Sequence, residues 1–159
     1  MKPLPLLSFL ALTLGGLLGG CATSVRPDSI LVSVADLKPA SATATETRVV
    51  MTLRFTSESL NAFGFSGSAH KLYLNGGYVG RAVSDQPIGL PPMSSSTHDV
   101  TLVLENAAVM KQLLALRGSS TVPYRLETTL FTKTGDDEQR IKSKFEGTID
   151  LRALQADSR

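Results

Sequence analysis

Residues 49–56 read Val-Val-Met-Thr-Leu-Arg-Phe-Thr, and this stretch decides the fold class. Val49, Met51, Leu53 and Phe55 point to one side of an extended chain, and the mostly polar residues between them point to the other. Such alternation is typical of a strand with one buried and one exposed face. The stretch therefore predicts a sheet that covers a core on one side.

The same alternation recurs on both sides of this stretch. Ile30, Val32 and Val34 predict a first strand, and the small polar residues 40–47 predict a loop or a ragged edge after it. Alternating segments downstream predict further strands around residues 63–65, 72–74, 78–83, 100–104, 124–131 and 141–151. Each of these strands offers one apolar face, which is what two facing layers need.

Turn-forming residues separate these segments. Asn75-Gly76 supplies the positive φ values that a tight hairpin turn requires. Pro87 and Pro91-Pro92 exclude a continuous central strand in their region, so we expect a short edge segment there and then a turn at Ser94–Ser96. The charged run Lys133–Gln139 predicts a longer turn before the last strand.

The apolar period changes to that of a helix after residue 105. Apolar residues there recur at helical spacing: Val109, Met110, Leu113, Leu114 and Leu116. They predict a helix of about three turns over residues 106–117, with Asn106 as N-cap and Gly118 as C′ residue. We expect the stripe Val109/Leu113/Leu116 to pack on the sheets or close one end of them, and a partner groove is the alternative. Many half-buried strands and one helix together predict a mostly β chain, an antiparallel β-sandwich of about seven strands.

The N-terminus carries the pattern of a lipoprotein signal. Lys2 precedes an apolar run that is too short, at roughly 15 residues, to span a bilayer that needs about 20. The run ends in Leu18-Gly19-Gly20-Cys21, which resembles the lipobox of bacterial lipoproteins. The resemblance implies cleavage before Cys21 and attachment of lipid to its sulfur. The alternatives are an ordinary signal peptide followed by a chance cysteine, or a core cysteine.

Ala22 follows the expected lipidation site. In Gram-negative lipoproteins an aspartate at this position tends to retain the protein on the inner membrane, so Ala22 implies an outer-membrane lipoprotein that faces the periplasm. We expect a signal peptide at residues 1–20, a lipidated N-terminus and tether at 21–29, one folded domain at 30–151 and a tail at 152–159.

Composition narrows the possible classes of protein. The 159 residues carry a formal net charge of +2, and the loss of residues 1–20 removes Lys2 and no acid. Such a small net positive charge does not suit a protein that binds nucleic acid. The remaining length allows one domain with a real core, and 42% hydrophobic residues are too many for a disordered chain. Since Cys21 is the only cysteine, no disulfide within the chain stabilises it.

A resemblance to a known family rests on the order of several motifs. They are Val32-Ser33-Val34 with Leu37-Lys38-Pro39, then Val50-Met51-Thr52-Leu53-Arg54-Phe55, Leu72-Tyr73-Leu74-Asn75-Gly76, Ser84–Pro91, Leu113-Leu114 and Tyr124–Glu127. This order resembles the late embryogenesis abundant (LEA) type 2 group with its water-stress and hypersensitive-response (WHy) domain, over roughly residues 30–151. The resemblance implies an immunoglobulin-like sandwich without a catalytic site, and a role in tolerance of drying, cold or osmotic stress. The family's Asn-Pro-Asn-like turn is replaced here by Thr56–Asn61.

Few residues are candidates for catalysis or metal binding. His70 and His98 are the only histidines, and with Cys21 lipidated no His/Cys cluster remains for zinc. His98-Asp99 beside Ser94–Ser96 contains the residue types of a catalytic triad. Adjacent residues on a strand point to opposite faces, so we expect loop polar residues there and no relay.

Three further groups have a structural interpretation. Gly64-Phe65-Ser66-Gly67 is not G-x-S-x-G, and no strand-to-helix elbow surrounds it. Asp136-Asp137-Glu138 lacks the spacing of a calcium loop, so we expect a solvated hairpin tip. Tyr73 and Tyr78 flank the hairpin turn, where cross-strand packing is the expectation and an exposed binding patch the alternative. We therefore expect no catalytic, cofactor or metal site.

These observations lead to two functional hypotheses. The first is a non-enzymatic lipoprotein, anchored through Cys21, that protects in desiccation, osmotic or cold stress by weak contact with unfolding proteins or the membrane. The second is an adaptor or assembly factor of the cell envelope that binds one partner through a strand edge, with residues 84–93 as the candidate edge.

Overall fold

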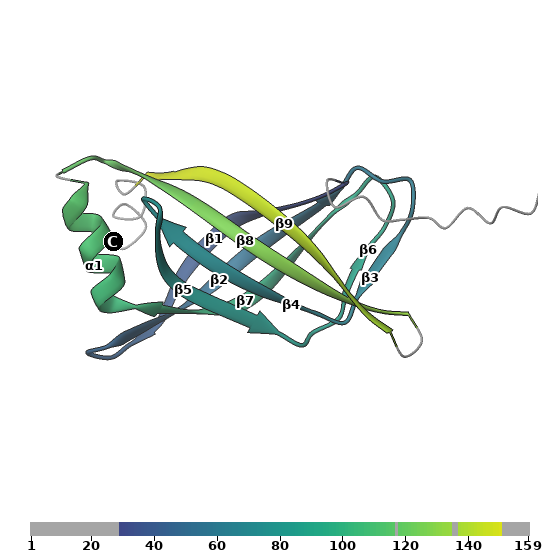
Figure 1. Cartoon of the computed structure of the whole chain (residues 1–159), viewed down its shortest axis with the longest axis horizontal. Coiled ribbons are helices and arrows are strands. Elements are labelled where there is room, and N and C mark those ends of the chain that lie inside the picture. Colours follow the sequence, from purple (N-terminus) through teal and green to yellow (C-terminus); the bar gives the residue numbers. More distant parts are fainter. Residues whose placement is uncertain (1–28, 117, 135–136, 151–159) are drawn as a thin grey trace, which may run out of the picture.

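The computed structural model describes residues 29–116, 118–134 and 137–150. Antiparallel strands dominate this part of the chain, and one helix follows the seventh strand (Figure 1). The elements in order are β1 (Ile30–Ala42), β2 (Glu46–Ser57), β3 (Phe63–Phe65), β4 (Gly67–Leu74), β5 (Gly77–Ser84), β6 (Ile88–Leu90), β7 (Ser95–Glu105), α1 (Asn106–Ala115), β8 (Thr121–Thr134) and β9 (Asp137–Asp150).

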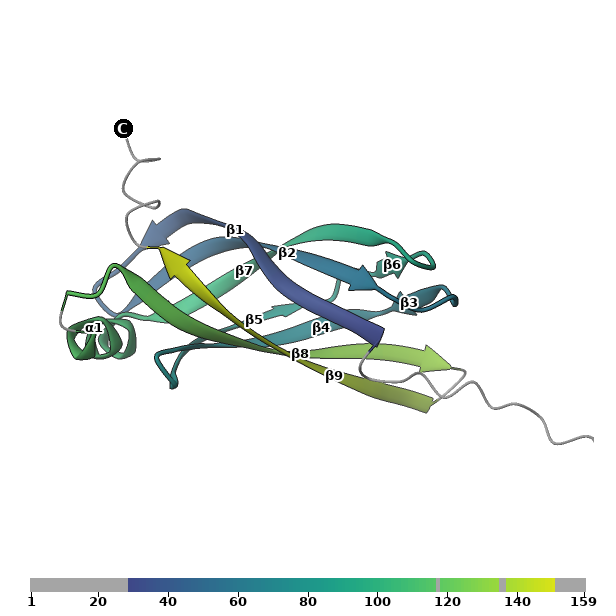
Figure 2. The same ribbon diagram turned by 90° about the horizontal axis from the view of Figure 1, so that it is seen from above.

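Seven of the strands form one antiparallel sheet in the order β1-β2-β7-β5-β4-β8-β9, and β3 pairs with β6 in a small second sheet. The large sheet curls strongly, so that β1 at one edge approaches β9 at the other (Figure 2). Ser143 Oγ on β9 donates a hydrogen bond to the backbone oxygen of Ile30 on β1, at 3.1 Å. The prediction of a mostly β antiparallel sandwich with one helix is confirmed, and its facing layers are halves of one curled sheet.

Strand β2 lies where the sequence pattern places it. Val49, Met51, Leu53 and Phe55 are buried, and β2 pairs along its length with β1 and β7. The inward side chains of the other strands complete the core, among them Val32, Leu72, Val79, Leu102, Leu126 and Leu130. Because β2 lies between β1 and β7, its buried face determines which face of these two neighbours is also buried.

Backbone pairing continues through polar residues at three of the predicted breaks. Residues 40–47 form a ragged edge with a short loop, since the register shifts between Pro39 and Ser41 and Ala42 of β1 still pairs with Thr47 of β2. The turn expected at Ser94–Ser96 ends at Ser94, because β7 begins at Ser95. The charged turn expected at Lys133–Gln139 is also shorter, since β8 and β9 stay paired up to Thr134 and Asp137.

The helix ends differ from the prediction by one residue each. The N-cap of α1 is Glu105, and no side chain caps the helix. Asn106 is the first helical residue; its side chain accepts a hydrogen bond from Thr47 Oγ1 at 2.8 Å and donates one to the Thr43 carbonyl at 2.9 Å. It therefore fastens the helix to the β1–β2 loop. Gly118 has a left-handed φ of 87°, but two positions after the C-cap Leu116.

Helix α1 closes one end of the curled sheet (Figure 1). Val109, Leu113 and Leu116 pack against the core, as the stripe predicts, while Met110 and Leu114 remain exposed. The small β3–β6 sheet lies at the opposite end of the molecule in both overall views. The described domain therefore has two distinct ends joined by the curled sheet.

Candidate functional site

The expected lipidation residue Cys21 and the expected sorting residue Ala22 lie outside the described residues. The described chain begins at Ser29, whose backbone oxygen accepts a hydrogen bond from Glu58 N–H at 3.0 Å. This bond holds the beginning of the domain against the loop that follows β2. The described part of the domain therefore begins beside this loop.

His70 is the centre of a buried polar group on β4. Its Nδ1 lies 2.9 Å from Thr128 Oγ1, and its Nε2 lies 2.9 Å from Ser68 Oγ. Both hydroxyls are buried with the ring, and the ring makes an edge contact with Phe55. Because a hydroxyl both donates and accepts, either neutral tautomer of the imidazole is satisfied. Burial lowers the pKa of His70 to about 4, so the ring is neutral near pH 7.

The Ser68–His70 contact has the atoms of a nucleophile and its base but not the access. Ser68 is 0% exposed and His70 is 1% exposed, so a substrate carbonyl has no approach to the serine oxygen. A nucleophile must face a position where the reacting atom can bind. The geometry therefore makes this group a hydrogen-bonded part of the core.

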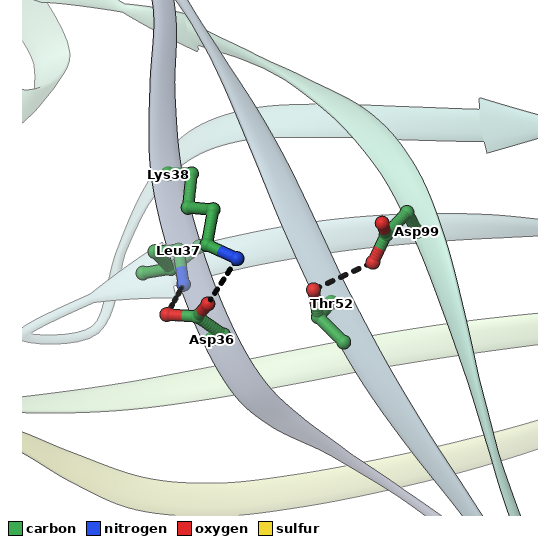
Figure 3. A network of polar contacts seen from close by, with 5 residues as sticks. All are labelled: Asp36, Leu37, Lys38, Thr52 and Asp99. Carbon is green, nitrogen blue, oxygen red and sulfur yellow. Dashed lines mark hydrogen bonds and ion pairs between the residues drawn. The ribbon is translucent and has the colours of Figure 1, made fainter.

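His98 and Asp99 lie on opposite faces of β7, as the strand period predicts. The His98 ring packs edge-on against Phe55 of the core, with ring centroids 5.7 Å apart. Asp99 faces outward, and its Oδ1 accepts a hydrogen bond from Thr52 Oγ1 of β2 at 2.6 Å (Figure 3). The two residues therefore form no relay, and each has a structural role on its own face.

The outer edge of β1 is closed by its own side chains. Asp36 accepts a hydrogen bond from the Leu37 N–H at 2.8 Å and forms an ion pair with Lys38 at 3.2 Å (Figure 3). The Lys38 hydrogen bond, with help from Leu37 N–H, lowers the pKa of Asp36. Irregular register near Val34 and Pro39 bends the same strand. Charges, bulges and a proline are devices that keep an edge from pairing with another chain.

The proline-marked segment at residues 84–93 contains a short strand, as predicted. Its residues Ile88–Leu90 pair with β3 and with no second strand among the described residues. Ile88 and Leu90 are buried, while Gly89 is exposed. This free edge is three residues long, so it offers a partner only a short run of backbone hydrogen bonds.

Tyr73 and Tyr78 pack across the β4–β5 hairpin, which confirms the structural interpretation. Their ring centroids are 5.8 Å apart in an edge arrangement. The Arg125 guanidinium lies 4.1 Å from the centre of the Tyr73 ring. Glu127 accepts a hydrogen bond from the Tyr73 hydroxyl at 3.2 Å and forms an ion pair with Arg125, also at 3.2 Å. The four side chains form one interlocked cluster on the outer face of the sheet.

Serine side chains shape two corners of the fold that the sequence pattern left unassigned. In the segment that replaces the family's Asn-Pro-Asn-like turn, Ser57 Oγ accepts from Ser59 N–H and Ser59 Oγ accepts from Asn61 N–H. Such side-chain to backbone bonds are typical of turns that serine forms. Within Gly64-Phe65-Ser66-Gly67, Ser66 Oγ donates to the Phe131 carbonyl at the β3–β4 corner, and no helix follows it.

The described residues contain neither a metal-binding cluster nor a membrane-spanning helix. No group of three or more histidine, cysteine, aspartate or glutamate side chains in this part of the chain is placed to hold a metal ion. Asp136 lies outside the described residues, and the side chains of Asp137 and Glu138 are not described either. No helix in the described ranges is both long enough and apolar enough to cross a bilayer.

Comparison with solved structures identifies the fold. A protein of Arabidopsis thaliana with a known solution structure superposes with a TM-score of 0.59 at 15% identity, covering 76% of this chain and 80% of that one. A protein of Archaeoglobus fulgidus with a crystal structure gives 0.48 at 18% identity, covering 74% of this chain and 97% of that one. A comparison with curated proteins gave no match.

One protein family matches most of the described domain. The family described as late embryogenesis abundant protein matches residues 59–147, which run from the loop after β2 to β9. This match covers more than half of the chain and includes the β4–β5 hairpin, the helix and most of the β8–β9 pair. The chain belongs to the late embryogenesis abundant protein family, in its type 2 group.

Proposed function

We propose that this protein is a non-enzymatic lipoprotein that protects the cell envelope during desiccation, osmotic or cold stress. The observation that carries the proposal is the family match over residues 59–147, because the family resemblance implies a stress role. The burial of Ser68 and His70 and the separation of His98 from Asp99 support a role without catalysis.

The domain protects by weak contact between its exposed outer face and either unfolding proteins or the membrane surface. Lys142, Lys144 and Glu146 are exposed along β9, and Lys144 pairs with Glu146 at 2.7 Å. A face of mixed charge keeps the domain dispersed without selecting one partner by its charge. Meanwhile the packed core keeps the domain folded while neighbouring proteins begin to unfold.

The location follows from the N-terminal sequence. Stable anchoring to a membrane takes two or more acyl chains, and the lipid on Cys21 supplies them. The lipid therefore holds the domain on the membrane. Ala22 directs the protein to the outer membrane, where the domain faces the periplasm. The mass of the N-terminal peptide tests the anchor: a diacylglyceryl cysteine at position 21 supports it, and a mature chain that begins elsewhere without lipid contradicts it.

Drying tests the protective role. The chain from residue 22 contains the whole described core, so we would dry a fragile enzyme with this chain or with an equal mass of an unrelated β-sandwich. We expect more enzyme activity to survive with this chain than with the control. Equal survival would contradict the stress role and favour the second candidate.

The second candidate is an envelope adaptor that binds one partner through a sandwich edge. The free edge of β6 favours it, because Ile88–Leu90 has a strand neighbour on one side only among the described residues. Pull-down from solubilised envelopes separates the two functions. A single stoichiometric partner whose binding is lost when Gly89→Pro alters the edge of β6 supports the adaptor function. Many weakly bound partners support the protective function.

A further inference from the structure

Two large apolar side chains are exposed at the end of the domain where the described chain begins. Leu60 is 83% exposed in the loop after β2, and Met93 is 64% exposed in the turn before β7. Phe63, half-buried and stacked on Phe65, lies at the start of β3 close to this loop. We call Leu60, Phe63 and Met93 the apolar tip.

Hydrogen bonds tie together the two segments that carry Leu60 and Met93. Three backbone bonds join the chain start, the loop and the turn: Glu58 N–H to Ser29 O at 3.0 Å, Ser57 N–H to Ser94 O at 2.8 Å and Met93 N–H to Ser59 O at 2.9 Å. Met93 has a φ of 48°, a left-handed conformation that is uncommon outside glycine. A fixed turn therefore holds Met93 in water beside the loop that carries Leu60.

The apolar tip is also the end of the domain nearest to the expected lipid. Only eight residue steps separate Cys21 from Ser29, so the two lie at most about 29 Å apart. The β3–β6 end and helix α1 are at opposite ends of the molecule (Figure 1). A lipid on Cys21 therefore keeps the apolar tip close to the bilayer.

We propose that the apolar tip docks on the membrane that holds the anchor, with Leu60 and Met93 in the boundary between headgroups and acyl chains. The proposal rests on the proposed lipid anchor. Two side chains bind a bilayer weakly alone, but a short tether raises their effective concentration to the order of millimolar. Docking would orient the domain with α1 pointing away from the membrane.

The chemistry of the surrounding loops selects the kind of lipid contact. Between residues 57 and 66 the only charged residue is Glu58, and between 84 and 95 it is Asp85. Because these two loops carry no cation, anionic lipid headgroups do not attract them, and the contact with the membrane is apolar. We therefore expect it to persist in vesicles without anionic lipid and at high salt.

Fluorescent labels at two leucines test the proposal. Leu60→Cys and Leu114→Cys replace the same residue type at opposite ends, and Leu114 is 71% exposed. Each lipidated variant carries one free thiol, which takes an environment-sensitive label before insertion into phosphatidylethanolamine–phosphatidylglycerol vesicles. We expect shallow nitroxide lipids to quench the label at residue 60 severalfold more than the label at 114.

Each outcome separates docking from anchoring. A lipidated chain that floats with the vesicles but shows equal, weak quenching at both positions would overturn docking and leave the anchor intact. A chain that carries no lipid and does not float would overturn both. A label at residue 60 that is shielded in whole envelopes and not on vesicles would overturn docking in favour of a protein partner.

Discussion

His70 illustrates how single side chains in this domain are satisfied without contact with water. Both ring nitrogens meet buried hydroxyls, from Ser68 on the same strand and Thr128 on β8. The sequence indicates where His70 points, because it shares its parity along β4 with the core residues Leu72 and Leu74. Its partner Thr128 is 58 residues away, and only the pairing of β4 with β8 brings the two together.

Burial of His70 predicts that the domain loses stability in mild acid. The pKa of His70 is lowered from 6.5 to about 4, so the unfolded chain takes up a proton at higher pH than the folded chain. Its contribution is fully present above pH 6.5 and falls as the pH drops toward 4, by up to about 3 kcal/mol. Urea unfolding at several pH values should show this loss in the wild type and a smaller one in His70→Gln. Equal pH dependence of the two proteins would contradict it.

Gly147 makes room for the side chain that joins the two halves of the sheet. A Cβ at this position would lie 2.6 Å from the Tyr124 ring, and Tyr124 itself hydrogen-bonds the Val34 backbone on β1. We expect Gly147→Ala to lower the free energy of unfolding by about 1–3 kcal/mol, because the ring must move. Gly64→Ala is the control, since its Cβ would meet nothing within 4 Å. Similar urea midpoints for the two variants would show that the ring is free to shift.

At the scale of elements, alternation located the strands well and their ends poorly. The period-two pattern identified β2 because Met51, Leu53 and Phe55 face the core. It failed at Ala42 and Thr134, where a polar strand continues because its neighbour still offers backbone partners. Asn106 misleads for another reason: its residue type favours an N-cap, but its side chain bonds the β1–β2 loop, 63 residues away in sequence from Thr43. Local composition carries no signal of such a contact between distant segments.

Neighbouring leucines on α1 provide a matched test of how the helix packs. Leu113 packs against the core, and Leu114 is 71% exposed. We expect Leu113→Ala to lower the free energy of unfolding by about 2 kcal/mol, because apolar contacts with the sheet are lost. Leu114→Ala should change it by less than about 0.5 kcal/mol. The opposite ranking in urea unfolding would mean that the helix presents its other face to the core.

At the scale of the whole molecule, the sheet closes on itself in a way that the sequence does not reveal. Ile30 at the start of β1 meets Ser143 on β9, although the two are 113 residues apart. The sequence pattern predicts facing layers, and the structure makes them from one curled sheet with α1 at one end and the β3–β6 sheet at the other (Figures 1 and 2). This arrangement gives the proposed lipoprotein a membrane end and a free end.

The survival of dried cells is the decisive measurement for the proposed stress role. A strain without the gene would receive the wild-type chain or a version secreted through an ordinary signal peptide, without lipid on Cys21. We expect deletion to lower survival, the wild type to restore it, and the unanchored form to restore it only in part. Unchanged survival on deletion would contradict the stress role, and full rescue by the unanchored form would contradict the need for the anchor.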